Sequence, residues 1–108
     1  MVFLKVESGT SYAAKDVFCE IAPNVKFTKF HCYYDIMKLD SDIYFCGTLN
    51  DTKREIQISL PLTAGYGGTG PHDLIDCIRA AGFSEEEIPS NSILEQPEDR
   101  IVRIDFIR

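Results

Sequence analysis

A cluster of four glycines within the six residues Gly65–Gly70 constrains this chain more than any other feature. Glycine loses more backbone entropy on folding than any other residue, so such a cluster is unfavourable inside a helix or a strand. It marks backbone that turns sharply or approaches another group closely. The cluster therefore separates a series of strand-like segments before it from an apolar, helix-like segment directly after it.

Three segments before the cluster are typical of strands. Residues 25–36 and 43–49 are rich in β-branched and aromatic side chains, and residues 55–60 alternate between polar and apolar. Short polar turns separate the three, which predicts an antiparallel meander. Within the first strand the apolar parity changes near Thr28 and Lys29, which predicts a β-bulge.

Two amphipathic helices are also predicted. Apolar residues recur at helical spacing over 11–21, and Thr10 or Ser11 can cap the start of this helix. A second helix with a broad apolar side follows the glycines over residues 71–81, with proline in its first turn. Gly82 is placed to end it in the left-handed conformation.

Residues 2–7 and 102–106 complete the pattern as the first and last strands, whereas residues 91–99 are polar and read as irregular. The sequence therefore predicts a single α+β domain over residues 1–108. We expect a mainly antiparallel sheet of about five strands in the order β-α-β-β-β-α-β, with two helices packed on one face. The order of the strands within the sheet does not follow from the sequence.

The glycine loop and the residues that follow it are the first candidate site, because binding groups concentrate in loops held on rigid elements. In the packing interpretation, Tyr66 covers the loop and Thr69 caps the second helix. In the ligand interpretation, backbone N–H groups at the helix N-terminus hold an anion. A protein contact is a third interpretation. The candidate residues are Tyr66, Gly67, Gly68, Thr69, Gly70, His72 and Asp73.

The loop matches the known nucleotide-binding motifs poorly. A Gly-x-Gly-x-x-Gly string can be laid on Gly65–Gly70, but the dinucleotide motif belongs to a parallel βαβ unit, and the strands here read as antiparallel. No Lys-Ser or Lys-Thr pair follows the glycines, which excludes the phosphate loop of nucleotide hydrolases. Pro71 also removes one N–H that a phosphate would use.

The segment Gly65–Leu74 resembles a small uncharacterised family of phage and bacterial proteins. Members of that family carry a strand, a Gly-Tyr-Gly-Gly-Ser/Thr-Gly-Pro turn and an apolar helix, and the likeness covers Gly65–Ile78. The chain departs from the family at Pro61–Ala64, where an aromatic-rich approach is expected. The resemblance implies a small accessory protein of phage or bacterial origin, and it implies no activity.

The net charge of −6 lies entirely in the second half of the chain, where ten acidic residues accompany four basic ones. Acidic proteins repel nucleic-acid phosphate, so direct binding to DNA or RNA is not expected. Glu85 and Glu86 are candidate contacts for a basic partner. In the alternative interpretation, this acidic run forms the start of a helical turn, with a capping box between Ser84 and Glu87.

The residues do not suggest an enzyme. The two histidines, His31 and His72, have no nucleophile and orienting group at a recognisable spacing. We expect His31 to be packed in the sheet and His72 to be exposed. The four cysteines show no metal-binding spacing, and we expect buried, reduced thiols. They are Cys19, Cys32, Cys46 and Cys77.

The sequence therefore predicts a small, acidic, cytoplasmic binding protein without enzymatic activity, cofactor or metal. We expect it to inhibit a partner protein by covering it, as toxin-immunity proteins and phage inhibitors of host defence do. The absence of a long apolar run argues against a membrane partner. The alternative is a binder or sponge for an anionic or nucleotide-like ligand, held by the loop from Gly65 to His72.

Overall fold

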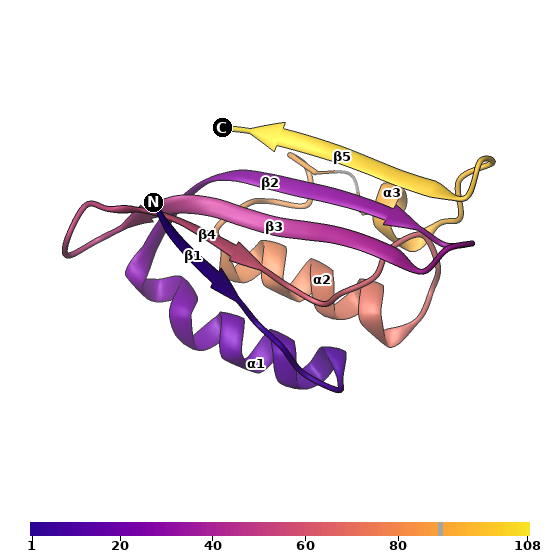
Figure 1. Cartoon of the computed structure of the whole chain (residues 1–108). Helices are drawn as coiled ribbons and strands as arrows, with labels where there is room; N and C mark the ends of the chain where they lie inside the picture. The colour runs from indigo at the N-terminus through magenta and orange to yellow at the C-terminus, as the bar shows by residue number, and fades with distance from the viewer. Residues whose placement is uncertain (89) are drawn as a thin grey trace.

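The computed structural model describes residues 1–88 and 90–108 and has the predicted α+β architecture (Figure 1). Five strands form one sheet, and the two main helices pack beside each other. The elements in chain order are β1 (Val2–Lys5), α1 (Ser11–Ile21), the 3-10 turn η1 (Ala22–Asn24), β2 (Val25–Asp35), β3 (Asp40–Leu49), β4 (Glu55–Ser59), α2 (Thr69–Ala80), α3 (Asn91–Leu94) and β5 (Ile101–Ile107).

The strands are arranged in the order β1-β4-β3-β2-β5. Strands β2, β3 and β4 form the predicted antiparallel meander, and β5 pairs antiparallel with the outer side of β2. Strand β1 pairs with β4 in parallel, so the sheet is mixed. The chain can reach this parallel position because β1 is joined to the meander through α1, which crosses one face of the sheet.

The predicted bulge lies in β2, where the register against β3 shifts between Phe27 and Lys29. The extra residue keeps Phe27 and Phe30 on the same face, although they are three positions apart. Gly47 lies opposite this point, and a Cβ atom there would overlap the Lys26 carbonyl oxygen. The backbones of β2 and β3 therefore come unusually close at the bulge, and glycine at position 47 makes this possible.

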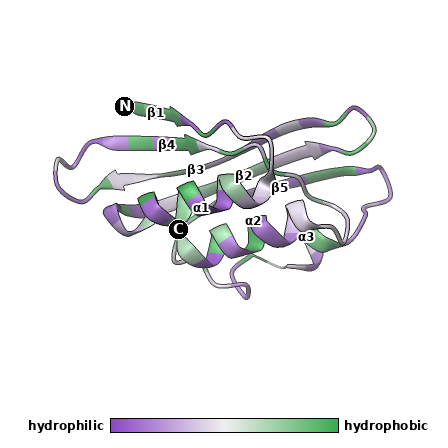
Figure 2. Ribbon diagram, turned by 90° about the horizontal axis from the view of Figure 1, so that it is seen from below, coloured by the Kyte–Doolittle hydropathy of each residue, from purple (hydrophilic) through white to green (hydrophobic). Residues whose placement is uncertain are grey.

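Both main helices cover the same face of the sheet, as the view from the helix side shows (Figure 2). Helix α1 begins as predicted, because the Thr10 hydroxyl accepts a hydrogen bond from the Ala13 N–H at 3.1 Å. Under the helices, Phe45 packs against Phe18 and Phe30, with ring centroids 4.8 Å apart in both pairs. These fully buried rings form the centre of the core.

Two local expectations were wrong. Part of the segment read as irregular forms the short helix α3, because Ile93 is buried against the core and holds one helical turn there. The cysteines are not all buried: Cys19 is exposed and Cys46 is half-buried, whereas Cys32 and Cys77 are buried. All four are free thiols, and burial raises the pKa of Cys32 to about 12.

Candidate functional site: the loop end of the sheet

The glycine loop joins β4 to α2 and has clear steric reasons for three of its glycines. Gly65 has a positive φ of 91°, and a Cβ atom there would lie 2.8 Å from the Ile36 side chain. A Cβ atom on Gly68 would overlap the Tyr66 ring. Gly67, by contrast, has open space around it and no positive φ. These contacts favour the packing interpretation of the loop.

The same packing holds the first turn of α2. A Cβ atom on Gly70 would meet the Thr63 hydroxyl oxygen, which is itself hydrogen-bonded to the Tyr66 hydroxyl at 2.7 Å. Tyr66 therefore covers the loop as predicted. The expected cap was wrong, because Gly68 occupies the N-cap position without a side-chain hydrogen bond and Thr69 is already helical. A tight loop places glycine at the cap because the Tyr66 ring excludes any side chain there.

The two histidines lie in different surroundings. His72 is exposed, and its Nδ1 lies 2.8 Å from the Gly68 carbonyl oxygen. Because a carbonyl only accepts, Nδ1 carries the proton, and the other ring nitrogen is the acceptor in neutral imidazole. His31 lies on the sheet face opposite the helices and stacks on Tyr44, with ring centroids 4.7 Å apart. Both histidines match the expectations drawn from the sequence.

Asp73 is buried and connects the two helices. Its carboxylate accepts a hydrogen bond from the Ser11 hydroxyl at 2.6 Å and lies 3.4 Å from the Lys15 ammonium. Lys15 also lies 3.4 Å from Asp76, one turn further along α2. Asp73 thus links α2 to α1 through Ser11 and Lys15. It has a structural role, unlike the exposed residues of the loop.

Glu85 and Glu86 lie beyond the other end of α2 and do not join the loop. Helix α2 has twelve residues and a length of roughly 18 Å; the glycine loop lies at its N-terminal end and the two glutamates lie beyond its C-terminal end. Glu85 forms an ion pair with Arg79. The capping box is confirmed, because the Ser84 N–H donates to Glu87 at 3.0 Å and the Glu87 N–H donates to the Ser84 hydroxyl at 3.1 Å. This capping box closes a turn at residues 84–88, and these described residues form no helix.

The structure instead brings the turn between β2 and β3 against the glycine loop. Ser41 donates a hydrogen bond to the Leu62 carbonyl at 2.8 Å, and Ile36 lies against Gly65. The buried Asp35 fixes this turn, because its carboxylate accepts hydrogen bonds from the Met37 N–H at 3.0 Å and from the next N–H at 3.2 Å. Two rigid turns therefore meet at one end of the sheet.

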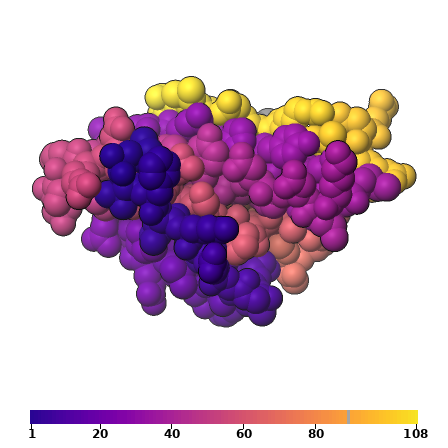
Figure 3. All heavy atoms as spheres, in the orientation of Figure 1, coloured from indigo at the N-terminus to yellow at the C-terminus, as the bar shows by residue number. Residues whose placement is uncertain are grey.

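Large apolar side chains are exposed on these turns. Leu39 is 75% exposed, Met37 is 66% exposed and Tyr66 is 40% exposed. Met37 and Leu39 lie on the β2–β3 turn and Tyr66 lies on the glycine loop, and we call this end of the molecule, with these three residues, the loop end. In the space-filling view, the β2–β3 turn projects at the right-hand end of the molecule, beside the segment that leads into β5 (Figure 3). Of the three residues, the sequence analysis named only Tyr66.

The backbone of Leu39 is unusual. Its φ of 54° lies in the left-handed region, which costs a residue with a Cβ atom about 1–2 kcal/mol. Glycine and asparagine are the residues that favour this conformation in turns. A sequence signal was present, because Leu39 is a large apolar residue within the polar turn of residues 38–42.

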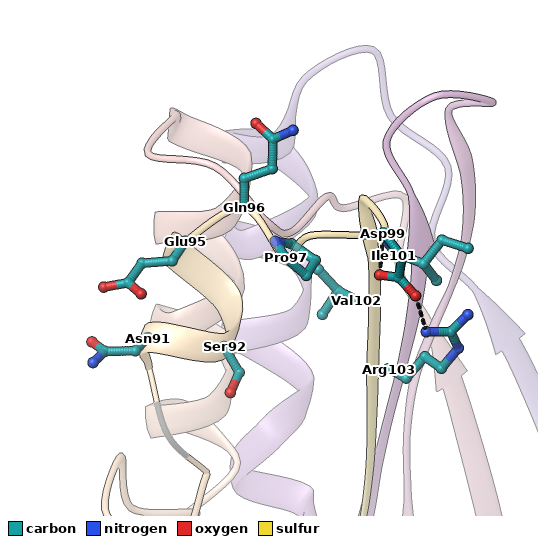
Figure 4. A pocket seen from close by; sticks show the side chains of 9 residues that line it. All are labelled: Asn91, Ser92, Glu95, Gln96, Pro97, Asp99, Ile101, Val102 and Arg103. Carbon is teal, nitrogen blue, oxygen red and sulfur yellow. Dashed lines mark hydrogen bonds and ion pairs between the residues drawn. The ribbon is translucent and has the colours of Figure 1, made fainter.

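A groove opens beside the loop end, between α3 and β5 (Figure 4). Its volume is about 480 Å³, and most of its lining side chains are polar. Asp99 lies at the start of β5 and forms an ion pair with Arg103 at 2.8 Å. This hydrogen bond, together with one from the Ile101 N–H, lowers the pKa of Asp99. The groove lining is Asn91, Ser92, Glu95, Gln96, Pro97, Asp99, Ile101, Val102 and Arg103.

Within residues 1–88 and 90–108, no group of three or more histidine, cysteine or carboxylate side chains is arranged to hold a metal ion. None of the helices in this part of the chain has the length and apolar character needed to cross a bilayer. The loop end itself presents exposed apolar side chains.

Comparison with known protein families gave no match, and no curated protein or solved structure is significantly similar to the chain. The resemblance of Gly65–Ile78 to a phage and bacterial family stays a prediction.

Proposed function

We propose that this protein binds a basic partner protein through the loop end and inhibits it by covering its surface. The observation that carries the proposal is Leu39, a large apolar side chain that is three-quarters exposed on left-handed backbone. Neither solubility nor folding favours leucine at such a position. A contact with a partner supplies the missing reason, since strained and exposed apolar residues gather at binding sites.

Met37 and Tyr66 extend this contact surface. Aromatic residues and methionine are enriched where proteins meet, because they provide much apolar contact area. The turn that carries Met37 is held by Asp35, and the Tyr66 hydroxyl is held by Thr63. The held Tyr66 side chain and the fixed backbone of the turn lose little conformational entropy on binding, so more of the contact energy contributes to affinity.

The acidic residues of the second half of the chain also support a basic partner. Residues 61–100 contain eight acidic and two basic side chains, and the rest of the chain is balanced. This segment includes Glu95 and Asp99 of the groove beside the loop end, together with Glu98. Acidic residues beside an apolar contact speed the capture of a basic partner and disfavour acidic competitors. Two cations lie at the contact itself, because Lys38 separates Met37 from Leu39 and Arg100 contacts Met37.

Inhibition by covering a partner requires no catalytic group and no rearrangement of this protein. The loop end lies on turns that are fixed by hydrogen bonds at the end of a packed sheet. A rigid projection of this kind can fill a cleft or cover a basic surface on the partner, which excludes the partner's own substrate.

The test is binding to the partner identified by native mass spectrometry after gentle purification from the host. We expect Leu39→Asn to weaken binding about tenfold or more, which is the loss expected for one central apolar contact. The same variant should be slightly more stable, because asparagine tolerates the left-handed conformation. Binding should also weaken as salt is added, since exposed charges are screened.

The matched control is Lys53→Asn. Lys53 has a φ of 60° in the turn between β3 and β4, away from the loop end. Asparagine there should give a similar gain in stability without a change in partner affinity. Equal binding by the Leu39→Asn variant and the wild type would contradict the proposal. A bound mass of a few hundred daltons in place of a protein would favour the ligand-binding alternative.

A further inference from the structure

The two edges of the sheet differ in their capacity to pair with another chain. Strand β1 is a short edge of four residues, whereas β5 is an edge of seven residues in continuous register with β2. Long regular edges are usually blunted by proline, lysine or a bulge, because their free backbone groups pair with other strands. Strand β5 has no proline or lysine, and its register against β2 shows no shift.

Two hydrogen bonds at its ends define which backbone groups of β5 are free. The Arg108 N–H donates to the Thr28 carbonyl at 2.8 Å, and the Ile36 N–H donates to the Arg100 carbonyl at 3.0 Å. Residues alternate in an antiparallel ladder, so the even-numbered residues of this strand face β2. The odd-numbered residues direct their N–H and C=O groups outward, and they are Ile101, Arg103, Asp105 and Ile107.

The sequence of β5 is complementary to itself when it is read in the opposite direction. It runs Ile-Val-Arg-Ile-Asp-Phe-Ile, with Ile104 at its centre. We propose that β5 pairs antiparallel with β5 of a second copy of this chain, about a two-fold axis at Ile104, to form one continuous sheet across a dimer. The proposal is independent of the partner contact at the loop end.

This register satisfies both the side chains and the backbone. Arg103 faces the partner's Asp105, and Asp105 faces the partner's Arg103, which gives two cross-strand ion pairs. All four of these residues direct their backbone groups outward, so each pair also exchanges two hydrogen bonds. Ile104 faces β2 with its backbone and meets its own copy as a pair without hydrogen bonds, as the two-fold axis requires.

Apolar residues match at the ends of the same register. Ile107, which is 72% exposed, lies opposite the partner's Ile101. On the helix-covered face, Val102 lies opposite the partner's Phe106. Pairing therefore covers an apolar side chain that the single chain leaves in water.

Asp99 covers the first part of this edge in the single chain (Figure 4). Its carboxylate accepts hydrogen bonds from the Ile101 N–H at 3.1 Å and from Arg103 at 2.8 Å. In the dimer, Arg103 exchanges Asp99 for the partner's Asp105. Asp99 thus competes with dimerisation, and Asp99→Ala should tighten the dimer.

The dimer leaves both loop ends free. Met37, Leu39 and Tyr66 lie near the start of β5, and an antiparallel arrangement carries the start of the second β5 to the far end of the shared sheet. The two loop ends therefore point in opposite directions, and each copy can hold one partner molecule. Loss of dimerisation would leave partner binding by each copy intact, so the two proposals fail separately.

Charge reversal in β5 tests the proposal by analytical ultracentrifugation. Asp105→Arg and Arg103→Asp each place like charges opposite one another twice, so either variant should weaken the wild-type dimer about tenfold or more. An equimolar mixture of the two variants restores opposite charges at both pairs and should form a heterodimer. The control Asp16→Arg makes the same charge change on α1, far from β5, and should dimerise like the wild type.

Cysteine cross-linking tests the register. Cys32 lies opposite Ile104 in the same chain, so the background is Cys19→Ser with Cys32→Ala. There Ile104→Cys places two thiols at the two-fold axis, where the Cα atoms of a pair without hydrogen bonds lie about 4.5 Å apart, within disulfide reach. We expect a disulfide-linked dimer for this variant. Ile107→Cys carries a more exposed thiol that faces no copy of itself, and it should cross-link more slowly. A monomeric wild type at its highest soluble concentration, or a dimer that ignores both charge reversals, would overturn the proposal.

Discussion

The two ends of α2 are built in different ways. At its N-terminal end, glycines occupy positions where the Tyr66 ring and the Thr63 hydroxyl leave no space for a side chain. At its C-terminal end, Gly82 takes a positive φ of 88° and a capping box closes the next turn. The C-terminal end obeys rules of fixed spacing, whereas the N-terminal end depends on how particular side chains pack.

Within the glycine cluster, some positions require glycine because a side chain would overlap a neighbour, and one position does not. Gly68 and Gly70 are fixed by neighbours within the loop, but Gly67 has open space around it. The N-terminal end also depends on a contact between elements distant in sequence, because Asp73 holds Ser11 and Lys15 of α1. We therefore expect substitutions at this end to be more destabilising than those at the C-terminal end.

The largest effect is expected for Gly70→Ala. Its new methyl group would overlap the Thr63 hydroxyl, and such overpacking costs about 1–3 kcal/mol of unfolding free energy. Urea unfolding measures this loss, and Gly67→Ala is the matched control, with little or no loss. Adding Thr63→Ala to Gly70→Ala should recover part of the stability, and a strictly additive double variant would contradict the steric explanation.

The next effect is expected for Asp73→Ala. It removes a buried carboxylate and leaves the Ser11 hydroxyl and Lys15 without that partner, so we expect a loss of about 2 kcal/mol in unfolding free energy. The same substitution at Asp16, which is exposed on α1, should cost much less. Equal losses for the two variants, measured by urea unfolding, would show that the link between the helices contributes little.

A smaller effect is expected at the C-terminal end for Ser84→Ala. The substitution removes the hydroxyl that accepts the Glu87 N–H, and loss of a capping side chain costs about 1 kcal/mol. Ser84→Thr keeps the hydroxyl and should retain most of the stability. Thermal unfolding followed by circular dichroism measures both variants. A loss as large as that of Gly70→Ala would contradict the ranking of the two ends.

The smallest effect is a pH dependence at the same turn. The hydrogen bond from the Ser84 N–H, and then that from Arg108, lower the pKa of Glu87 in the folded protein. A lowered pKa gives stability that is present above the unfolded value of about 4.3 and is lost as the pH falls through the folded value. The stability difference between the wild type and Glu87→Gln should therefore shrink below about pH 4. Urea unfolding at about pH 7 and at about pH 3 measures it, and an unchanged stability difference between the two would contradict the assignment.

The predictable part of the fold is the part governed by local rules. The meander, the bulge at Thr28, the Thr10 cap and the left-handed Gly82 all follow from alternation, parity or capping residues close in sequence. The parallel pairing of β1 with β4 did not follow, because alternation sets which side chains share a face and does not identify the neighbouring strand. Likewise, α3 depends on one buried residue, Ile93.

The candidate site was predictable only in part. Tyr66 and the glycine loop stood out by composition, but Leu39 becomes notable only when its backbone conformation and its exposure are known together. Glu85 and Glu86 were predicted as contacts for a basic partner because acidic residues crowd the second half of the chain, and the structure places them at the end of α2 opposite the loop.

The sequence by itself determined the strands, the two main helices, the Thr10 cap, the capping box and the acidic second half, because these depend on residue types at short, fixed spacings. Only the tertiary structure decided that the β2–β3 turn meets the glycine loop, that Asp73 joins two helices and that β5 is an open edge. These features depend on contacts between residues far apart in the chain. Such contacts are chosen by the packing of the whole core, so no short stretch of sequence specifies them.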